Sequence, residues 1–165
     1  MQHVQTRSTT SALVLTAVLI ALATLFTMYT KIPVPGIRGY FNVGDVVIMT
    51  SALLLGRKYG AYIGAIGPAL ADLFLGYAVF VPITFVVKGI EGYLVGTVYN
   101  NKTTTSALAA TIVGGIIIVA GYFIAEYFVF DPGVAIASIL TNAIQAVMSV
   151  IISMILYAIL RKRLG

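Results

Sequence analysis

The sequence predicts an all-α membrane protein, a single domain over residues 1–165 that forms a bundle of six transmembrane helices. Of its 165 residues, 60% are hydrophobic and 9% are charged, whereas a soluble domain carries about 25% charged residues. The apolar residues also fall into six segments, most of them close to the ~20 residues that cross a bilayer. These segments cover roughly residues 11–30, 43–56, 59–76, 79–99, 106–128 and 133–160.

Turn-forming residues set the boundaries between the segments. The first segment ends at Lys31-Ile32-Pro33 without a small-residue cleavage pattern, so we expect a retained helix rather than a signal peptide. The second segment, at about 14 residues, is short for a full span. We expect it to be tilted or shallow, or to have a binding loop at its outer end. The later breaks contain Gly, Asn or Pro, at residues 56–60, 76–77, 100–103 and 131–133.

The basic residues indicate how the helices are oriented. Seven Lys and Arg residues fall on the side of the N-terminus and two on the opposite side. Because short cytoplasmic loops carry an excess of Lys and Arg, we expect a multi-pass membrane protein with both termini in the cytoplasm. The basic residues then face anionic lipid headgroups, so no nucleic-acid partner is expected. The seven are Arg7, Arg57, Lys58, Lys102, Arg161, Lys162 and Arg163, and the two are Lys31 and Arg38.

Several kinds of chemistry are excluded by residues that the sequence lacks. It has no cysteine, and its one histidine is His3 in the polar N-terminal tail, so we expect no metal site and no cofactor. It contains no phosphate-binding loop, no His-Glu-x-x-His motif and no nucleophile elbow. We therefore expect no catalytic residues, and transport driven by ATP needs a separate ATPase.

Polar residues inside the apolar segments mark the candidate site. Lys88 and Glu91 lie one helical turn apart in the fourth segment, so both can point away from lipid. A charge that meets lipid costs about 2.5–3.5 kcal/mol, and intramembrane charges therefore indicate function. Asp72 in the third segment, and Asn142 and Gln145 in the sixth, fall in the outer part of the membrane. The alternatives are a structural ion pair between Asp72 and Lys88, and hydrogen bonds between helices through the two amides.

Two further carboxylates and the first external connection lie at a similar depth. Asp45 is equally explained by the first turn of a helix, where the dipole favours a negative charge, and Glu126 by exposure at the interface. The connection over residues 31–42 is either a lid or a simple turn, and it ends in Tyr40 and Asn42. Together these groups predict an outward-facing cavity with aromatic walls and polar atoms from several helices, the usual form of a ligand pocket.

Small residues predict where helices approach closely. Gly60, Gly64 and Gly67 lie along one face of the third segment, a spacing typical of tight helix packing. In the first segment, Ala17 and Ala21 form an Ala-x-x-x-Ala pattern that can face either the bundle or a partner protein.

Several runs of residues resemble a known family. They are Gly39-Tyr40-Phe41-Asn42-Val43-Gly44-Asp45, Leu53-Leu54-Leu55-Gly56-Arg57-Lys58-Tyr59-Gly60, Lys88-Gly89-Ile90-Glu91-Gly92-Tyr93-Leu94-Val95-Gly96 and Ala17-Val18-Leu19-Ile20-Ala21. They are similar to the substrate-binding S components of energy-coupling factor (ECF) vitamin transporters. The similarity is greatest to the riboflavin-type branch, which includes predicted carriers of hydroxymethylpyrimidine and pyridoxine.

The resemblance implies a multi-pass protein in the plasma membrane of a prokaryote that captures a vitamin from outside the cell. Its partners would be a transmembrane coupling subunit, on which Ala17 and Ala21 dock, and two cytoplasmic ATPase subunits. The first external loop would be the lid, formed by Pro33, Pro35, Gly36 and Arg38. The resemblance supports as substrate-binding candidates Tyr40, Asn42, Asp72, Lys88, Glu91, Asn142 and Gln145.

The residue types in the site limit the kinds of ligand that it can bind. A carboxylate, an amide and aromatic walls suit a small heteroaromatic ring with hydroxymethyl groups. We expect pyridoxine or hydroxymethylpyrimidine, with riboflavin as the nearest alternative. Two other functions stay open: a stand-alone proton-coupled carrier that uses Glu91 or Asp72, and a membrane subunit without a ligand.

Overall fold

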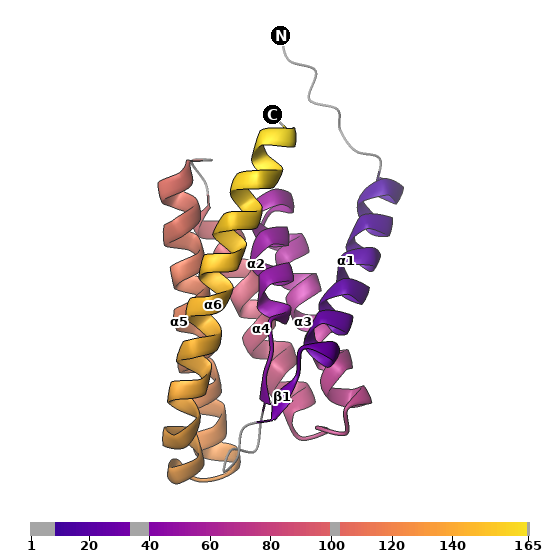
Figure 1. Ribbon diagram of the computed structural model, residues 1–165. Helices are drawn as coiled ribbons and strands as arrows, with labels where there is room; N and C mark the ends of the chain where they lie inside the picture. The colour runs from indigo at the N-terminus through magenta and orange to yellow at the C-terminus, as the bar shows by residue number, and fades with distance from the viewer. Residues whose placement is uncertain (1–8, 34–39, 100–102, 165) are drawn as a thin grey trace.

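The computed structural model describes residues 9–33, 40–99 and 103–164, which form six helices and one two-stranded sheet. The helices form one bundle, and the first begins at the same end at which the last finishes (Figure 1). The elements are α1 (Thr9–Tyr29), β1 (Ile32–Pro33), β2 (Tyr40–Phe41), α2 (Gly44–Leu55), α3 (Arg57–Phe74), α4 (Phe80–Val98), α5 (Thr104–Val129) and α6 (Pro132–Leu164). The six predicted helices are therefore confirmed.

The short second helix, α2, lies at the centre of the bundle. It contacts all five other helices, and nine of its twelve residues are buried. Because its neighbours surround it, α2 does not need the length of a lipid-facing span. Its apolar side chains Met49 and Leu53 pack with Val95 of α4 and Ile118 of α5 to form the main core cluster.

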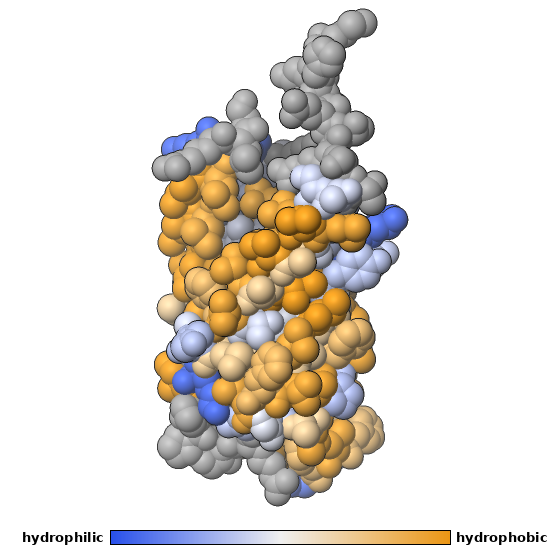
Figure 2. Space-filling view, turned by 90° about the vertical axis from the view of Figure 1, so that its right-hand side faces the viewer, coloured by the Kyte–Doolittle hydropathy of each residue, from blue (hydrophilic) through white to orange (hydrophobic). Residues whose placement is uncertain are grey.

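Four helices, α1, α4, α5 and α6, are long and apolar enough to cross a membrane. The α3 helix does not meet that criterion: it begins with Arg57 and Lys58 and carries Asp72. Hydrophobic residues cover most of the face of the molecule on the α1 side (Figure 2), as expected of a protein that spans a membrane.

Several predicted boundaries need correction by two to four residues: α1 and α5 each begin two residues earlier than predicted, and α3 ends at Phe74 rather than residue 76. The third helix begins at Arg57 rather than residue 59, because Gly56 alone separates it from α2. Gly56 has φ of 89°, in the left-handed region that glycine adopts at little cost, so one residue is enough to turn the chain. The sixth helix continues to Leu164 rather than residue 160.

The closest helix contact joins α3 and α4, as the glycine spacing predicts. A Cβ atom added at Gly64 would lie under 3.0 Å from the backbone carbonyl of Lys88, and one added at Gly92 would meet the carbonyl of Gly60 in the same way. These glycines let the two backbones touch. Gly67 faces α1 instead, where an added Cβ would lie 2.7 Å from that of Ala23.

The connection between α1 and α2 contains a small hairpin that was not predicted. The β1 strand pairs with β2 in antiparallel register, Ile32 opposite Phe41 and Pro33 opposite Tyr40. The backbone N–H of Val43 donates to Oγ1 of Thr30 at 3.0 Å and so ties the start of α2 to the end of α1. The lid over this connection stays a prediction, because Pro35, Gly36 and Arg38 lie outside the described residues and the side chains of Pro33 and Tyr40 are not described.

Candidate functional site

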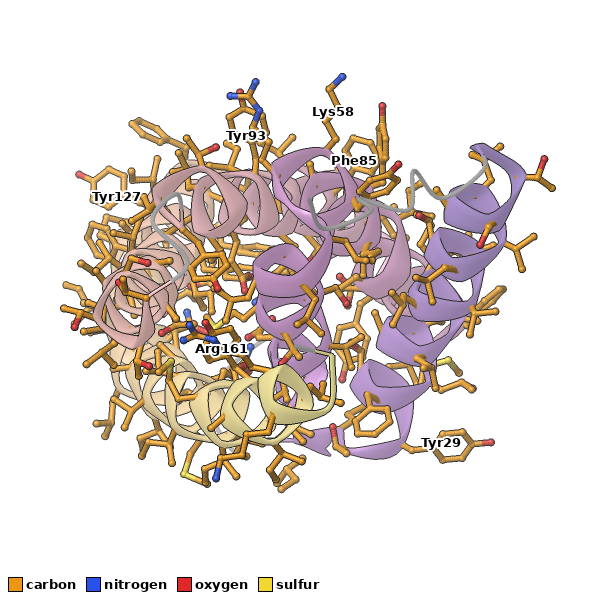
Figure 3. The ribbon with its side chains drawn as sticks, turned by 90° about the horizontal axis from the view of Figure 1, so that it is seen from above. Tyr29, Lys58, Phe85, Tyr93, Tyr127 and Arg161 are labelled. Atoms are coloured by element: carbon orange, nitrogen blue, oxygen red, sulfur yellow. The ribbon has the colours of Figure 1, made fainter. Side chains whose placement is uncertain are left out.

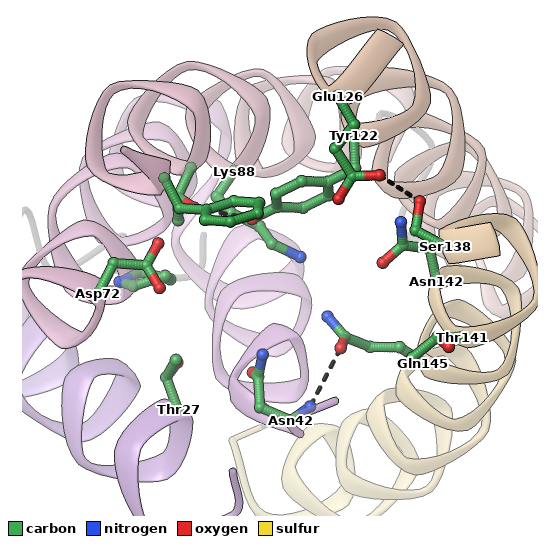
Figure 4. A pocket seen from close by; sticks show the side chains of 13 residues that line it. Thr27, Asn42, Asp72, Lys88, Tyr122, Glu126, Ser138, Thr141, Asn142 and Gln145 are labelled. Atoms are coloured by element: carbon green, nitrogen blue, oxygen red, sulfur yellow. Dashed lines mark hydrogen bonds between the residues drawn. The ribbon is translucent and has the colours of Figure 1, made fainter. Parts of the chain in front are cut away.

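A polar cavity lies at the end of the bundle opposite the chain termini, between five helices and the segment that leads into α2 (Figure 4). Its volume is about 40 Å³, which is enough for a few water molecules. A cavity that binds benzene in another protein measures about 150 Å³. Binding of a heteroaromatic ring therefore requires lining side chains to move outward. The cavity is lined by Thr27, Asn42, Pro68, Asp72, Phe80, Thr84, Lys88, Tyr122, Glu126, Ser138, Thr141, Asn142 and Gln145.

The floor of the cavity is a buried cluster of one cation and two carboxylates. Nζ of Lys88 lies 2.5 Å from Oδ1 of Asp45 and 3.4 Å from Oε2 of Glu91. Lys88 is 2% exposed, and both carboxylates are fully buried. The ammonium group also lies 5.3 Å from the centre of the Tyr122 ring, within reach of a cation–π interaction. Lys88 lines the cavity, whereas Glu91 lies beneath it.

A chain of hydrogen bonds links this cluster to the hairpin. The backbone N–H of Asn42, the residue after β2, donates to Oε1 of Gln145 at 3.0 Å. Nε2 of Gln145 donates to Oδ2 of Asp45 at 2.7 Å. The side chain of Asn42 turns back and accepts from the backbone N–H of Gly44 at 2.8 Å. Gln145 on α6 therefore holds the N-terminal end of α2 in place through two bonds, one to the backbone that leads into the helix and one to the side chain of Asp45 in its first turn.

The opposite wall of the cavity belongs to α5 and α6. The hydroxyl of Tyr122 is hydrogen bonded to Oγ1 of Thr84 on α4, at 2.9 Å. One turn further along α5, Glu126 accepts a hydrogen bond from the hydroxyl of Ser138 on α6. With Phe80, the ring of Tyr122 gives the cavity aromatic walls, as the sequence predicts.

The structure brings most of the predicted substrate-binding residues together. Five of the seven line the cavity, namely Asn42, Asp72, Lys88, Asn142 and Gln145. Glu91 lies below them, and the side chain of Tyr40 is outside the described part of the chain. Two alternatives were wrong. Lys88 pairs with Asp45 and Glu91 and not with Asp72, and Glu126 is 3% exposed rather than facing the interface.

Several lining residues were not predicted. Thr27, Thr84, Ser138 and Thr141 are single hydroxyl residues in apolar helices, where Ser and Thr commonly bond to their own backbone, so sequence alone gives them no signal. Asp45, which lies beside the cavity without lining it, was not predicted as a site residue either. Its depth in the membrane suggested a role, but a place in the first turn of a helix explained the residue equally well. Among the described residues no group of three or more His, Cys, Asp or Glu side chains is placed to hold a metal ion.

The alanine pair of α1 lies on the outside of the bundle. Ala17 and Ala21 are exposed, whereas Ala23 is fully buried against α3. Oγ1 of Thr24 fixes this orientation by donating to the carbonyl of Gly67 at 2.9 Å. Seen along the bundle in Figure 3, α1 forms one edge of the molecule. The two alanines therefore do not pack against the rest of the chain.

The model of the ECF-type riboflavin transporter S component family matches residues 7–162. The chain belongs to this family. An S component is a membrane-embedded part of a transporter and not an enzyme, and S components in general work with a membrane coupling subunit and ATPases. The predicted family and the all-α membrane fold are thus both confirmed.

Two known proteins are similar to this S component in sequence, and one solved structure is similar to it in fold. A protein of Pyrococcus woesei, described only as encoded in the 3' region of gap, is 41% identical in sequence. The match covers 86% of this chain and 96% of that protein. The thiamine precursor transporter HmpT of Lactococcus lactis subsp. cremoris (strain MG1363) is 29% identical, over 89% of this chain and 83% of its own. The solved S component of a bacterial ECF transporter superimposes with a TM-score of 0.77 at 20% identity and covers 94% of this chain and 98% of its own, which supports the fold.

Proposed function

We propose that this S component binds a small vitamin-type heteroaromatic ring, hydroxymethylpyrimidine or pyridoxine, in the cavity above Lys88. The observation that carries the proposal is the cavity itself: polar side chains from five helices converge between the rings of Phe80 and Tyr122, inside an otherwise apolar bundle. Buried polar groups of this kind discriminate strongly against ligands that leave them unpaired. The name of the HmpT relative, a thiamine precursor transporter, supports the pyrimidine.

The cavity opens toward the outside of the cell in this proposal. The α1 helix begins and α6 finishes at the end opposite the cavity (Figure 1). Arg57, Lys58 and Arg161 lie at that same end, where an excess of basic residues indicates the cytoplasm. A ligand would therefore reach the cavity from outside and would have to cross the remaining depth of the bundle.

Delivery of the ligand depends on partners. The exposed Ala17 and Ala21 leave a shallow strip on α1 where another helix can approach closely, so we assign to it the docking of a transmembrane coupling subunit. Two cytoplasmic ATPase subunits would supply the energy, because the chain has no phosphate-binding loop of its own.

Riboflavin is the second candidate, favoured by the description of the matching family. Its three fused rings need considerably more space than a single ring. The cavity of about 40 Å³ has to expand even for one ring, so its size favours the smaller ligands.

Equilibrium binding to the purified chain without ATP tests the proposal. Titration calorimetry with hydroxymethylpyrimidine, pyridoxine and riboflavin is expected to show micromolar or tighter binding of one of the first two, and weaker binding of riboflavin. Tight binding of riboflavin alone would replace the assigned ligand. If none of the three binds, the vitamin-binding function is wrong.

A further inference from the structure

We propose that Glu126 is the specificity-determining residue of the cavity, and that it selects a ring that carries an amino group next to a ring nitrogen. This inference rests on the proposed function, since it concerns the same cavity, and it narrows the ligand to the aminopyrimidine class. Three residues carry it: Glu126 on α5, and Ser138 and Asn142 on α6.

The first observation is the small number of partners that Glu126 has. Its side chain is 3% exposed and lines the cavity. Within the part of the chain that the structure describes, it has one hydrogen-bond partner, Ser138, and no Lys or Arg within 4.0 Å. A carboxylate has about four acceptor sites. Glu126 therefore keeps acceptor capacity that a ligand can use.

The second observation is that even this one partner is shared. The hydroxyl of Ser138 has a single hydrogen, and two acceptors lie within its reach: Glu126 and the backbone carbonyl of Ala135, at 3.0 Å. If the hydrogen goes to Ala135, the carboxylate of Glu126 has no donor among the described residues. A ligand N–H that reaches Glu126 lets Ser138 return to the backbone bond without loss.

The other carboxylates near the cavity are placed differently. Asp45 is held by Lys88 and Gln145, and Glu91 lies next to Lys88 beneath the cavity. Asp72 lies on α3, on the side of the cavity away from Ser138 and Asn142 (Figure 4). Of the carboxylates that line the cavity, Glu126 is therefore the one on the same side as the side-chain amide of Asn142.

The third observation is a donor next to this acceptor. Nδ2 of Asn142 is buried and has no hydrogen-bond partner among the described residues. Figure 4 shows Asn142 next to Ser138, one turn along α6 and on the same side of the cavity. A carboxylate that accepts and an amide that donates match the edge of an aminopyrimidine, whose amino group donates while the neighbouring ring nitrogen accepts.

The same pairing rejects an oxo-substituted ring. A carbonyl oxygen directed at Glu126 brings two acceptors together, with no hydrogen between them, and leaves a buried carboxylate unpaired. Hydrogen bonds to a charged group and the penalty for leaving such a group unpaired each amount to about one to two powers of ten in affinity. We expect wild-type protein to prefer the amino ring over the oxo ring by about 10- to 100-fold.

The test compares two ligands on two proteins by titration calorimetry. The ligands are hydroxymethylpyrimidine and its analogue in which oxo replaces the amino group; the proteins are wild type and Glu126→Gln. The glutamine has the same shape, and its side chain can both donate and accept a hydrogen bond. The ratio of the affinities for the amino ring and the oxo ring is therefore expected to fall close to one. An unchanged preference in Glu126→Gln would overturn the inference.

Two controls separate this inference from other outcomes. Leu140→Ala, at an exposed position of α6 outside the cavity lining, is expected to keep the preference; its loss there would show that the preference does not report on Glu126. Binding of pyridoxine or riboflavin to wild type, without binding of either pyrimidine, would overturn the inference and leave the vitamin-binding function intact. Failure of all these rings to bind wild type contradicts both. Melting curves recorded for each variant show that the proteins compared are folded.

Discussion

Replacing Lys88 with methionine is expected to destabilise the purified protein by about 3–5 kcal/mol, the usual cost of removing one partner from a buried ion pair. Methionine matches the length of the lysine stem, so packing is nearly conserved. The loss comes from Asp45 and Glu91, two fully buried carboxylates whose cation is gone. Thermal unfolding in detergent, followed by circular dichroism, measures the effect.

The neutral triple variant is the matched comparison. In Asp45→Asn, Lys88→Met, Glu91→Gln no charge of the cluster remains unpaired, and the amide oxygen of the new asparagine can still accept from Gln145, as the carboxylate of Asp45 does. Because a buried ion cluster is often replaced by neutral residues at little cost, most of the lost stability is expected to return. Lys58→Met, at the exposed basic end, should change the melting temperature little. A single Lys88→Met variant as stable as Lys58→Met would show that the cluster of Lys88, Asp45 and Glu91 does not stabilise the bundle.

Replacing Gly64 with alanine is expected to push α3 and α4 apart. The new Cβ would meet the backbone carbonyl of Lys88, which has no flexible end that could move aside. Added volume at a tight contact costs about 1–3 kcal/mol, and more where backbone must shift. Because the displaced residue is Lys88, we expect ligand affinity to fall together with the melting temperature.

Gly89→Ala provides the control on the same pair of helices. Its Cβ would lie 3.2 Å from the Cβ of Ala65, a contact that a shift of a few tenths of an ångström relieves. Alanine also favours a helix over glycine by up to about 1 kcal/mol. The two variants therefore share the gain in helix propensity and differ in the clash. Equal stability of the two variants would contradict the close approach of α3 and α4 at Gly64.

The helices could be predicted because each apolar segment and each break between segments is a local signal. The inaccurate boundaries have local causes as well. One glycine, Gly56, is enough to turn the chain into α3, so the basic residues that looked like a loop begin a helix instead. The hairpin was missed because its strands have two residues each, too few for an alternating pattern, and one of them contains Pro33.

The polar residues of the site were found because a charge or amide inside an apolar segment is conspicuous. Their partners were not predictable. Asp45 and Lys88 are 43 residues apart, and Asn42 and Gln145 are 103 apart. Both contacts exist because α2 lies between α4 and α6, and no local pattern reports that position. Glu126 shows the same limit: its burial depends on how α5 and α6 pack against each other.

Native mass spectrometry of the gently purified protein tests most directly whether this cavity holds the vitamin. Wild type is expected to carry a bound molecule with the mass of hydroxymethylpyrimidine or pyridoxine. Thr141→Phe fills the cavity from α6 and is expected to lose the bound molecule, whereas Leu140→Phe on the neighbouring exposed position is expected to keep it. Retention by Thr141→Phe, or no binding by wild type even after these vitamins are added, would contradict the assignment of the cavity.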